Sequence, residues 1–348
     1  MTSDCRVLAV ATAAPRHTVT QSEVRAFAGR LFARDFGDVD RLLAAFDNTG
    51  IERRQFACPL AWYEAPRGFA EKNRVYCDVA LELATNAAEA ALARAELPRS
   101  EIGAVVFVST TGVRTPSLDG ALLQRLDLPR STARVPIWGL GCAGGVAGLA
   151  RAADLVRGTG RPVLLVAVEL CSTTFVHGDR SKSNLIATAL FGDGAAAVVL
   201  GKCDRGPALL AARSELLDDT EDVMGWSLED DGLRVRFAKH IPAIVRDVVP
   251  AFVRGLAEAH GRDRAALRHF VVHPGGAKVL QAYERALDLA EYDLEASRAV
   301  LARYGNMSSV TVLFVLEQFL ASVAPTGALG VLLGLGPGFS AEGVLMRW

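Results

Sequence analysis

Apolar and polar positions along the chain predict helices and buried strands in alternation. The stretch 76–95 has the spacing of a helix, and a run of β-branched and apolar residues at 105–108 follows it. A second helical pattern ends near residue 156 and precedes an apolar run at 163–168. Helices that alternate with unbroken apolar strands are typical of a layered α/β fold in which both faces of the sheet are covered.

The second half of the chain repeats this order. A helical stretch at 242–259 leads to a strand at 270–273, and a further apolar helix precedes a strand at 330–333. The repetition predicts two similar halves, residues 1–203 and 204–348. A single doubly wound domain would give the same alternation, so the pattern alone leaves both organisations open.

Composition narrows the classes of function. The chain has 348 residues, of which 51% are hydrophobic, and its formal net charge is −1. It can therefore bury a large core, and neither nucleic acid nor an anionic membrane is expected as a partner. The six cysteines include no C-x-x-C pair, so we expect neither a disulfide framework nor a zinc site. The N-terminus lacks the apolar segment of a signal peptide, and the longest apolar runs fall short of the roughly 20 residues of a membrane-spanning helix, which favours the cytoplasm.

Cys142 is the first candidate for chemistry. It lies between glycines in the sequence GLGCAGG, where a loop meets the start of a predicted helix. The free N–H groups and positive dipole end of a helix N-terminus favour a thiolate, and flanking glycines let a substrate carbonyl approach the backbone. The alternative is a small buried cysteine that packs where a larger side chain would clash.

His273 and Asn306 occupy corresponding positions in the second half. His273 ends a predicted strand and precedes Pro-Gly-Gly, and Asn306 stands at the start of the second apolar helix. The separation of His273 from Asn306 nearly equals that of Thr110 from Cys142. Taken singly, the histidine could cap a turn and the asparagine could cap its helix. Two halves related by a pseudo-twofold axis would instead bring Cys142, His273 and Asn306 into one pocket.

Other glycine motifs are less specific. Gly139, Gly141 and Gly144 form a G-x-G-x-x-G pattern, but no acidic residue follows where a dinucleotide site needs one, and a cysteine stands within the motif. Gly336 and Gly338 belong to a GLGPG loop after an apolar strand. That loop is either a plain tight turn or a set of backbone donors that line a thioester site.

In combination, these motifs resemble the type III polyketide synthases, the chalcone-synthase-like branch of the thiolase superfamily. The likeness covers nearly the whole chain. The motifs that carry it are GCAGG around Cys142, ALFGDGAAA at 189–197, HPGG at 273–276, YGNMSS at 304–309 and GLGPG at 334–338. The resemblance implies a thiolase fold, five-layered αβαβα with two pseudo-duplicated halves, and a homodimer. It also implies CoA thioesters as substrates and no metal or redox cofactor.

The resemblance assigns roles that the chemistry can justify. Cys142 would attack an acyl thioester and carry the acyl chain, which is nucleophilic catalysis by an activated thiol. His273 would stabilise the thiolate and then, with Asn306, hold the thioester oxygen of malonyl-CoA as it loses CO2. Both side chains are donors aimed at a developing enolate oxygen, where fixed dipoles stabilise most.

The resemblance also implies residues that bind substrate. Phe191 matches a gatekeeper phenylalanine between the CoA tunnel and the reaction cavity, and Arg41 and Lys278 are candidates for binding the CoA phosphates. The remaining pocket candidates are Thr110, Thr115, Cys171, Trp226, Val235, Ser308, Gly336 and Gly338.

Departures from the plant enzymes bear on the starter. Thr115 stands where they carry a methionine that reaches across the dimer, and Cys171 replaces a threonine of the starter pocket. Val235 replaces a second gatekeeper phenylalanine. Small side chains at Thr115 and Cys171 would open a path for an alkyl chain, and Trp226 would fill part of it.

The sequence VELCSTTF is similar to bacterial enzymes that make alkylpyrones or alkylresorcinols. We therefore expect iterative condensation of malonyl-CoA onto a fatty acyl starter, delivered by CoA or by an acyl carrier protein, followed by cyclisation. One alternative is a single-step ketoacyl synthase III-like enzyme that primes fatty acids. Another is a catalytically inactive partner subunit, although the intact set of Cys142, His273 and Asn306 argues against it.

Overall fold

A computed structural model describes residues 4–33, 39–322 and 327–348, and for residues 39–42 it describes the backbone alone. Within these ranges, nine strands form one mixed sheet in the order β11-β12-β13-β8-β1-β7-β6-β4-β5. These strands are β1 (Cys5–Ala13), β4 (Ala104–Val108), β5 (Ala133–Ile137), β6 (Val163–Leu170), β7 (Asp193–Lys202), β8 (Ala208–Leu216), β11 (Leu267–Val272), β12 (Leu329–Gly336) and β13 (Ser340–Arg347). Two smaller ribbons pair β2 (His17–Thr20) with β3 (Arg53–Phe56) and β9 (Met224–Glu229) with β10 (Gly232–Phe237).

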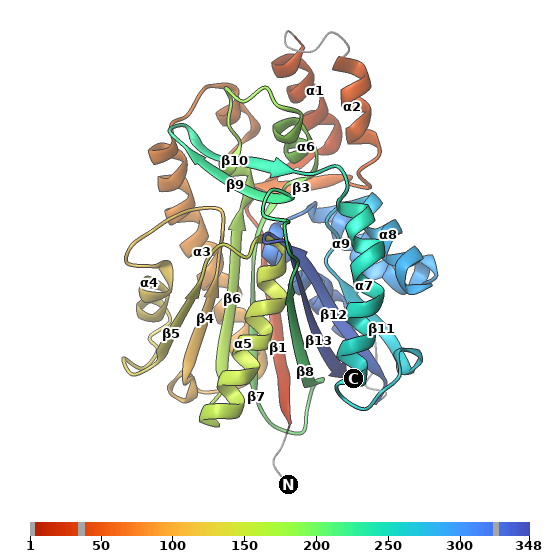
Figure 1. Cartoon of the computed structure of the whole chain (residues 1–348). Coiled ribbons are helices and arrows are strands. Elements are labelled where there is room, and N and C mark those ends of the chain that lie inside the picture. Colours follow the sequence, from red (N-terminus) through yellow and green to blue (C-terminus); the bar gives the residue numbers. More distant parts are fainter. Residues whose placement is uncertain (1–3, 34–38, 323–326) are drawn as a thin grey trace.

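Helices flank the large sheet and also form a cap at one end of it. The described helices are α1 (Gln21–Phe32), α2 (Val39–Asp47), α3 (Phe69–Ala95), α4 (Leu118–Arg125), α5 (Gly144–Thr159), α6 (Lys182–Leu190), α7 (Ile241–Glu258), α8 (Ala277–Leu287), α9 (Glu295–Tyr304) and α10 (Thr311–Ser322). In Figure 1, α1, α2 and α6 lie above the sheet together with the β9–β10 ribbon. No described helix is long and apolar enough to cross a membrane.

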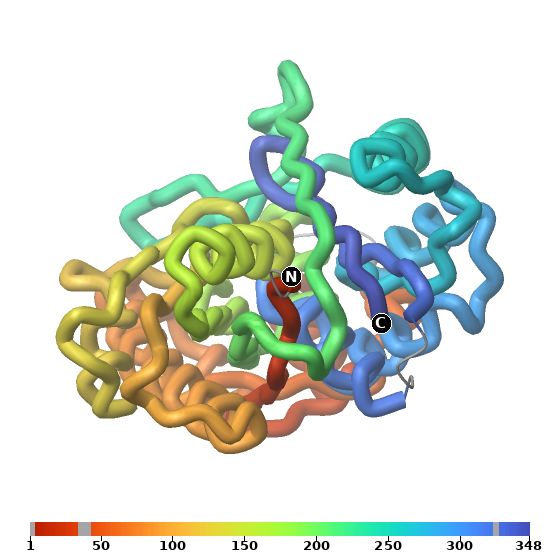
Figure 2. Tube along the Cα trace, turned by 90° about the horizontal axis from the view of Figure 1, so that it is seen from below, coloured from red at the N-terminus to blue at the C-terminus, as the bar shows by residue number. Residues whose placement is uncertain are grey.

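The strand order repeats between the two halves of the chain. In the first half β4 is parallel to β6, β7 is antiparallel to β6, and β1 is antiparallel to β7. In the second half β11, β12, β13 and β8 follow the same order with the same directions. The first half adds β5, which is parallel to β4 at the edge. The two parts of the sheet meet through one pair of residues, Arg6 and Ala208, and Figure 2 shows the halves on opposite sides of the molecule.

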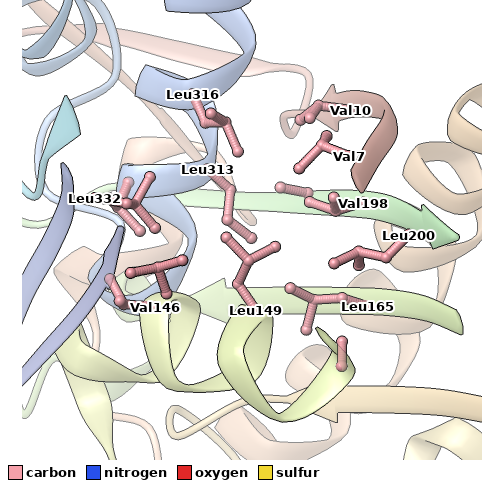
Figure 3. Packing of buried hydrophobic residues seen from close by; sticks show 14 of the residues in the cluster. Val7, Val10, Val146, Leu149, Leu165, Val198, Leu200, Leu313, Leu316 and Leu332 are labelled. Atoms are coloured by element: carbon pink, nitrogen blue, oxygen red, sulfur yellow. The ribbon is translucent and has the colours of Figure 1, made fainter. Parts of the chain in front are cut away.

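Two helices, α5 and α10, lie between the parts of the sheet and contact both. Val146 and Leu149 of α5 pack against Leu313 and Leu316 of α10, as Figure 3 shows, and all four side chains are buried. Burial of a leucine side chain contributes about 1.5–3 kcal/mol, so this layer accounts for much of the stability. Since α3 covers the other face of the first part and α7 that of the second, the molecule has five layers.

Local sequence signals set the ends of several helices and the burial of the strands. Thr20 and Glu23 form a capping box that starts α1. Gly160 ends α5 in a left-handed conformation, with φ at 72°, which glycine adopts without strain. All eight residues of β6 are buried, as the unbroken apolar run predicted for a strand covered on both faces.

Candidate active site

The three predicted catalytic side chains are buried at one end of the sheet. Cys142 lies in a short 3-10 turn, η3 (Gly141–Ala143), that leads directly into α5. His273 follows β11 at once, and Asn306 lies between α9 and the 3-10 turn η7 (Ser308–Val310). Sites of α/β folds form at the carboxyl ends of parallel strands, where His273 stands.

Close contacts join Cys142 to Asn306 and place His273 beside the backbone to which Asn306 is bonded. The Sγ atom of Cys142 is 4.0 Å from Oδ1 of Asn306. The backbone N–H of Ser308 donates to Oδ1 of Asn306 at 2.8 Å, while Nδ2 donates to the carbonyl of Gly275 at 3.1 Å. This pair of contacts fixes the orientation of the amide and leaves one of its two N–H bonds for a ligand. Nε2 of His273 lies 3.8 Å from the point where a β-carbon on Gly275 would stand, so the ring is next to the same backbone.

Burial opposes charge on both the sulfur and the imidazole. It raises the pKa of the Cys142 thiol to about 12, although hydrogen bonds with Ser308 and Asn306 act in the opposite direction. It lowers the pKa of His273 to about 4, and neither ring nitrogen has a hydrogen-bond partner among the described residues. Burial by itself therefore favours the neutral thiol and the neutral imidazole at pH 7.

Glycines allow the two halves to meet at this point. A β-carbon on Gly145, in the first turn of α5, would lie 2.1 Å from the carbonyl oxygen of Ser309. A β-carbon on Gly336, at the end of β12, would lie 2.5 Å from the carbonyl oxygen of Leu140. Any larger residue would push apart the turns that carry Cys142 and Asn306.

Glu169, which the sequence analysis missed, ties the loops of the site together. Its carboxylate accepts hydrogen bonds from the backbone of Thr110, the hydroxyl of Thr111 and the hydroxyl of Ser309. Thr110 in turn accepts from the backbone N–H of Gly141 at 3.2 Å. Burial raises the pKa of Glu169 to about 7, and the hydrogen bonds from Ser309, Thr110 and Thr111 limit that rise. Glu169 belongs to the sequence VELCSTTF, but nothing in that sequence distinguishes a buried carboxylate that binds distant loops, because the residues before it form an apolar strand.

Four of the predicted pocket residues gather beside the site. Cys171 and Phe191 are buried in one apolar cluster, and Trp226 and Val235 of the β9–β10 ribbon pack against it. The rings of Phe191 and Trp226 are 5.9 Å apart between centroids. Burial raises the pKa of the Cys171 thiol well above its usual value, so this second cysteine is a neutral packing group.

A narrow cavity adjoins that cluster and extends under the cap. Its walls come from Val24, Phe27, Phe56, Leu60, Tyr63, Cys171, Ser172, Thr174, Phe175, Asn184, Ala187, Thr188, Phe191 and Val235. The free space within it is about 30 Å³, room for about two or three water molecules. The sequence predicted Cys171, Phe191 and Val235 here, but gave no sign that α1, β3 and the loop after it form the opposite wall.

Other predicted positions lie elsewhere. Thr115 is exposed in its own chain, and Lys278 is exposed in the first turn of α8. Ser308 is buried next to Asn306, and Gly338 is half-buried in the turn between β12 and β13. The side chain of Arg41 falls outside the described part of the structure. Within the described residues, no three His, Cys, Asp or Glu side chains are grouped so as to hold a metal ion.

The fold and the grouping of Cys142 with Asn306, with His273 nearby, match the expectation of a thiolase-type condensing enzyme. Residues 62–204 match the N-terminal domain of the chalcone and stilbene synthases, and residues 208–348 match the C-terminal domain. The chain therefore belongs to the chalcone and stilbene synthase family, the type III polyketide synthases, and is an acyltransferase.

Individual relatives support this assignment over the whole length. A 1,3,6,8-tetrahydroxynaphthalene synthase of Streptomyces peucetius is 40% identical, with 98% of this chain and 93% of the relative covered. An alpha-pyrone synthesis polyketide synthase-like protein of Mycobacterium tuberculosis is 30% identical, with 97% and 89% covered. The crystal structure of the tetrahydroxynaphthalene synthase of Streptomyces coelicolor has a TM-score of 0.94 at 32% identity, with 99% of each chain covered. The predicted family and thiolase fold are confirmed.

Proposed function

We propose that this enzyme condenses malonyl-CoA repeatedly onto a fatty acyl starter and cyclises the product to an alkylpyrone or alkylresorcinol. Cys142 carries the growing chain as a thioester. His273 accepts the thiol proton and then, with Asn306, holds the thioester oxygen of malonyl-CoA while CO2 leaves. The resulting enolate carbon attacks the thioester carbonyl on Cys142, which restores the sulfur for the next transfer.

The geometry at Asn306 supports its part in this division of labour. Oδ1 is occupied by the N–H of Ser308, so the amide presents an N–H rather than an oxygen to a ligand. Cys142 lies within 4.0 Å of the same side chain. A malonyl oxygen bound at Nδ2 would therefore place its enolate carbon close to an acyl group on the sulfur.

The observation that carries the starter proposal is the apolar cavity beside Cys171, Phe191 and Val235. Its free space is too small for an alkyl chain as it stands, so a chain can enter only if side chains move. Phe27 and Phe175 are in edge-to-face contact at 5.7 Å within the wall and are the candidates to turn aside. Each methylene buried there would contribute about 0.8 kcal/mol, which favours long starters over short ones.

Product analysis tests this function. The enzyme is incubated with malonyl-CoA and acyl-CoA starters from short to long, and the products are identified by mass spectrometry. We expect pyrones or resorcinols that contain two or three malonyl units on a long alkyl chain. One malonyl unit per product would indicate a single-step ketoacyl synthase instead. Products formed from malonyl-CoA alone would contradict the fatty acyl starter.

We also propose that the enzyme is a homodimer joined through β5. This strand has an open edge, and an unpaired edge is a template for pairing with another chain. Trp138, 57% exposed, and Val113 present apolar surface beside it. The exposed Thr115 lies in the same region of the sequence and would reach the cavity of the partner only in such a dimer. A monomer in light scattering would contradict this arrangement.

A further inference from the structure

Arg54, on β3, is a fully buried cation that the mechanism has not used. It is 0% exposed, and burial lowers its pKa only to about 9, partly because Asp193 opposes the shift, so it is charged at pH 7. Its Nη1 donates to the carbonyls of Thr188 and Phe191 at 2.8 and 2.7 Å, and its Nη2 donates to Oε1 of Gln21 at 2.7 Å. The first two acceptors are the end of α6.

Every carbonyl group at the end of α6 accepts a hydrogen bond, and two of them accept from Arg54. The last bond within the helix runs from the N–H of Phe191 to the carbonyl of residue 187. Beyond it, the carbonyls of residues 188 and 191 accept from Arg54, that of residue 189 accepts from Gln21, and that of residue 190 accepts from the backbone N–H of Asn306. The carbonyl groups that have no partner within the helix are those of residues 188–191, and we call this segment the socket. It binds one predicted catalytic residue, Asn306.

The socket holds Asn306 on two sides. Its N–H donates to Leu190 at 2.8 Å, and its carbonyl accepts from the N–H of Gly192 at 2.9 Å. Arg54 also packs against the preceding residue, since a β-carbon on Gly305 would lie 2.6 Å from Cδ of the arginine. The same segment, 190–192, carries the ring of Phe191 into the cavity wall.

A guanidinium suits this place because its planar fork reaches two carbonyls at once and a cation is favoured at the negative end of a helix. We propose that Arg54 is a positioning residue: by clamping the end of α6 it holds Asn306 and Phe191 in place for malonyl decarboxylation and condensation. It does not serve acyl transfer to Cys142, whose turn it does not touch. This inference rests on the proposed function of Asn306.

The test separates the two half-reactions in Arg54→Lys, which keeps the charge and loses the fork. Release of CO2 from malonyl-CoA is expected to fall about 10- to 100-fold, the usual cost of displacing a catalytic group by about 1 Å. Loading of an acyl group from acyl-CoA onto Cys142, followed by intact-mass analysis, is expected to stay at the wild-type rate. The matched control is Arg264→Lys, because Arg264 also donates to a helix-end carbonyl, that of Leu287, without touching the site. Arg264→Lys should change neither rate. Each variant is assayed at the same interval below its own melting temperature.

Equal losses in both half-reactions of Arg54→Lys would overturn the inference and leave Arg54 a purely structural residue. If that variant does not fold, Gln21→Met removes the side-chain acceptor of Arg54 and the donor to residue 189. It should give a smaller loss confined to decarboxylation, and the absence of any selective loss would again overturn the proposal. A wild-type enzyme that releases no CO2 would refute the proposed function itself, which the comparison of variants cannot do.

Discussion

Replacement of His273 by glutamine is expected to suppress the reactivity of Cys142 at neutral pH. Burial raises the pKa of the thiol to about 12, so without help only about one sulfur in 10⁵ would be ionised at pH 7. In general, a unit charge about 4 Å away contributes about 4 kcal/mol at an effective dielectric constant of about 20, which is about three pKa units. A thiolate on Cys142 and an imidazolium on His273 each bear the cost of burial, so only their mutual attraction favours the two charges as a pair. Loss of the ring removes that attraction, so the thiolate fraction at pH 7 should fall to that of the isolated buried thiol, about one in 10⁵.

The assay is the rate of alkylation by iodoacetamide between about pH 5 and about pH 10, with the modified cysteine identified by mass spectrometry. The wild type should be alkylated faster than His273→Gln at neutral pH, because its thiol and imidazole titrate as a coupled pair. In His273→Gln the rate should rise about tenfold per pH unit without levelling. His269→Gln is the control, since His269 is partly buried against Phe319 and Trp348, away from the site. An unchanged profile in His273→Gln would show that the helix N-terminus, and not the imidazole, ionises the sulfur.

Four further substitutions test the rest of the site. Cys142→Ala should abolish acyl-enzyme formation and leave the fold intact, and an acyl group found on Cys171 by intact-mass analysis would contradict the assignment. Asn306→Ala should slow malonyl decarboxylation about 100- to 1000-fold, the typical cost of one oxyanion donor, and acyl loading much less. Equal losses in both steps would argue against that role. Thr115→Phe should shift preference to shorter starters with no change in melting temperature, because Thr115 is exposed in its own chain; a uniform loss of rate would exclude it from any cavity. Glu169→Gln should flatten the pH dependence of unfolding: the raised pKa of about 7 means that ionisation destabilises the wild type by about 3 kcal/mol as pH rises from about 4.5 to about 7, and an unchanged slope in the variant would refute this.

Much of the fold could be predicted because its elements carry local signals. The apolar run that became β6 is buried along its whole length, and a strand of that kind has no polar face to obscure its pattern. The repeated order of helices and strands appears as a repeated strand order in the sheet. The division at residues 203 and 204 stays a prediction.

The parts that could not be predicted depend on residues far apart in the sequence. Glu169 lies in an apolar strand and joins loops separated from it by 58 and 140 residues. Arg54 stands beside a second arginine in a short strand, where nothing local distinguishes a buried cation from an exposed one. The cavity wall under α1 is formed by ordinary apolar residues, and no local pattern predicts which distant residues they contact in the fold. Thr115 was expected at the starter path, but a single chain leaves it on the surface.

The contact between the halves explains why the chemistry sits where it does. The first half supplies the sulfur and the second supplies the imidazole and the amide, and α5 and α10 start against each other at Gly145 and Ser309. Burial at this junction excludes water and makes each charge costly by itself. A thiolate in the first half is then favoured by an imidazolium supplied from the second half. Because water is excluded, a single amide N–H can stabilise an enolate strongly. Close packing of two similar halves is thus a requirement of the reaction as well as of the fold.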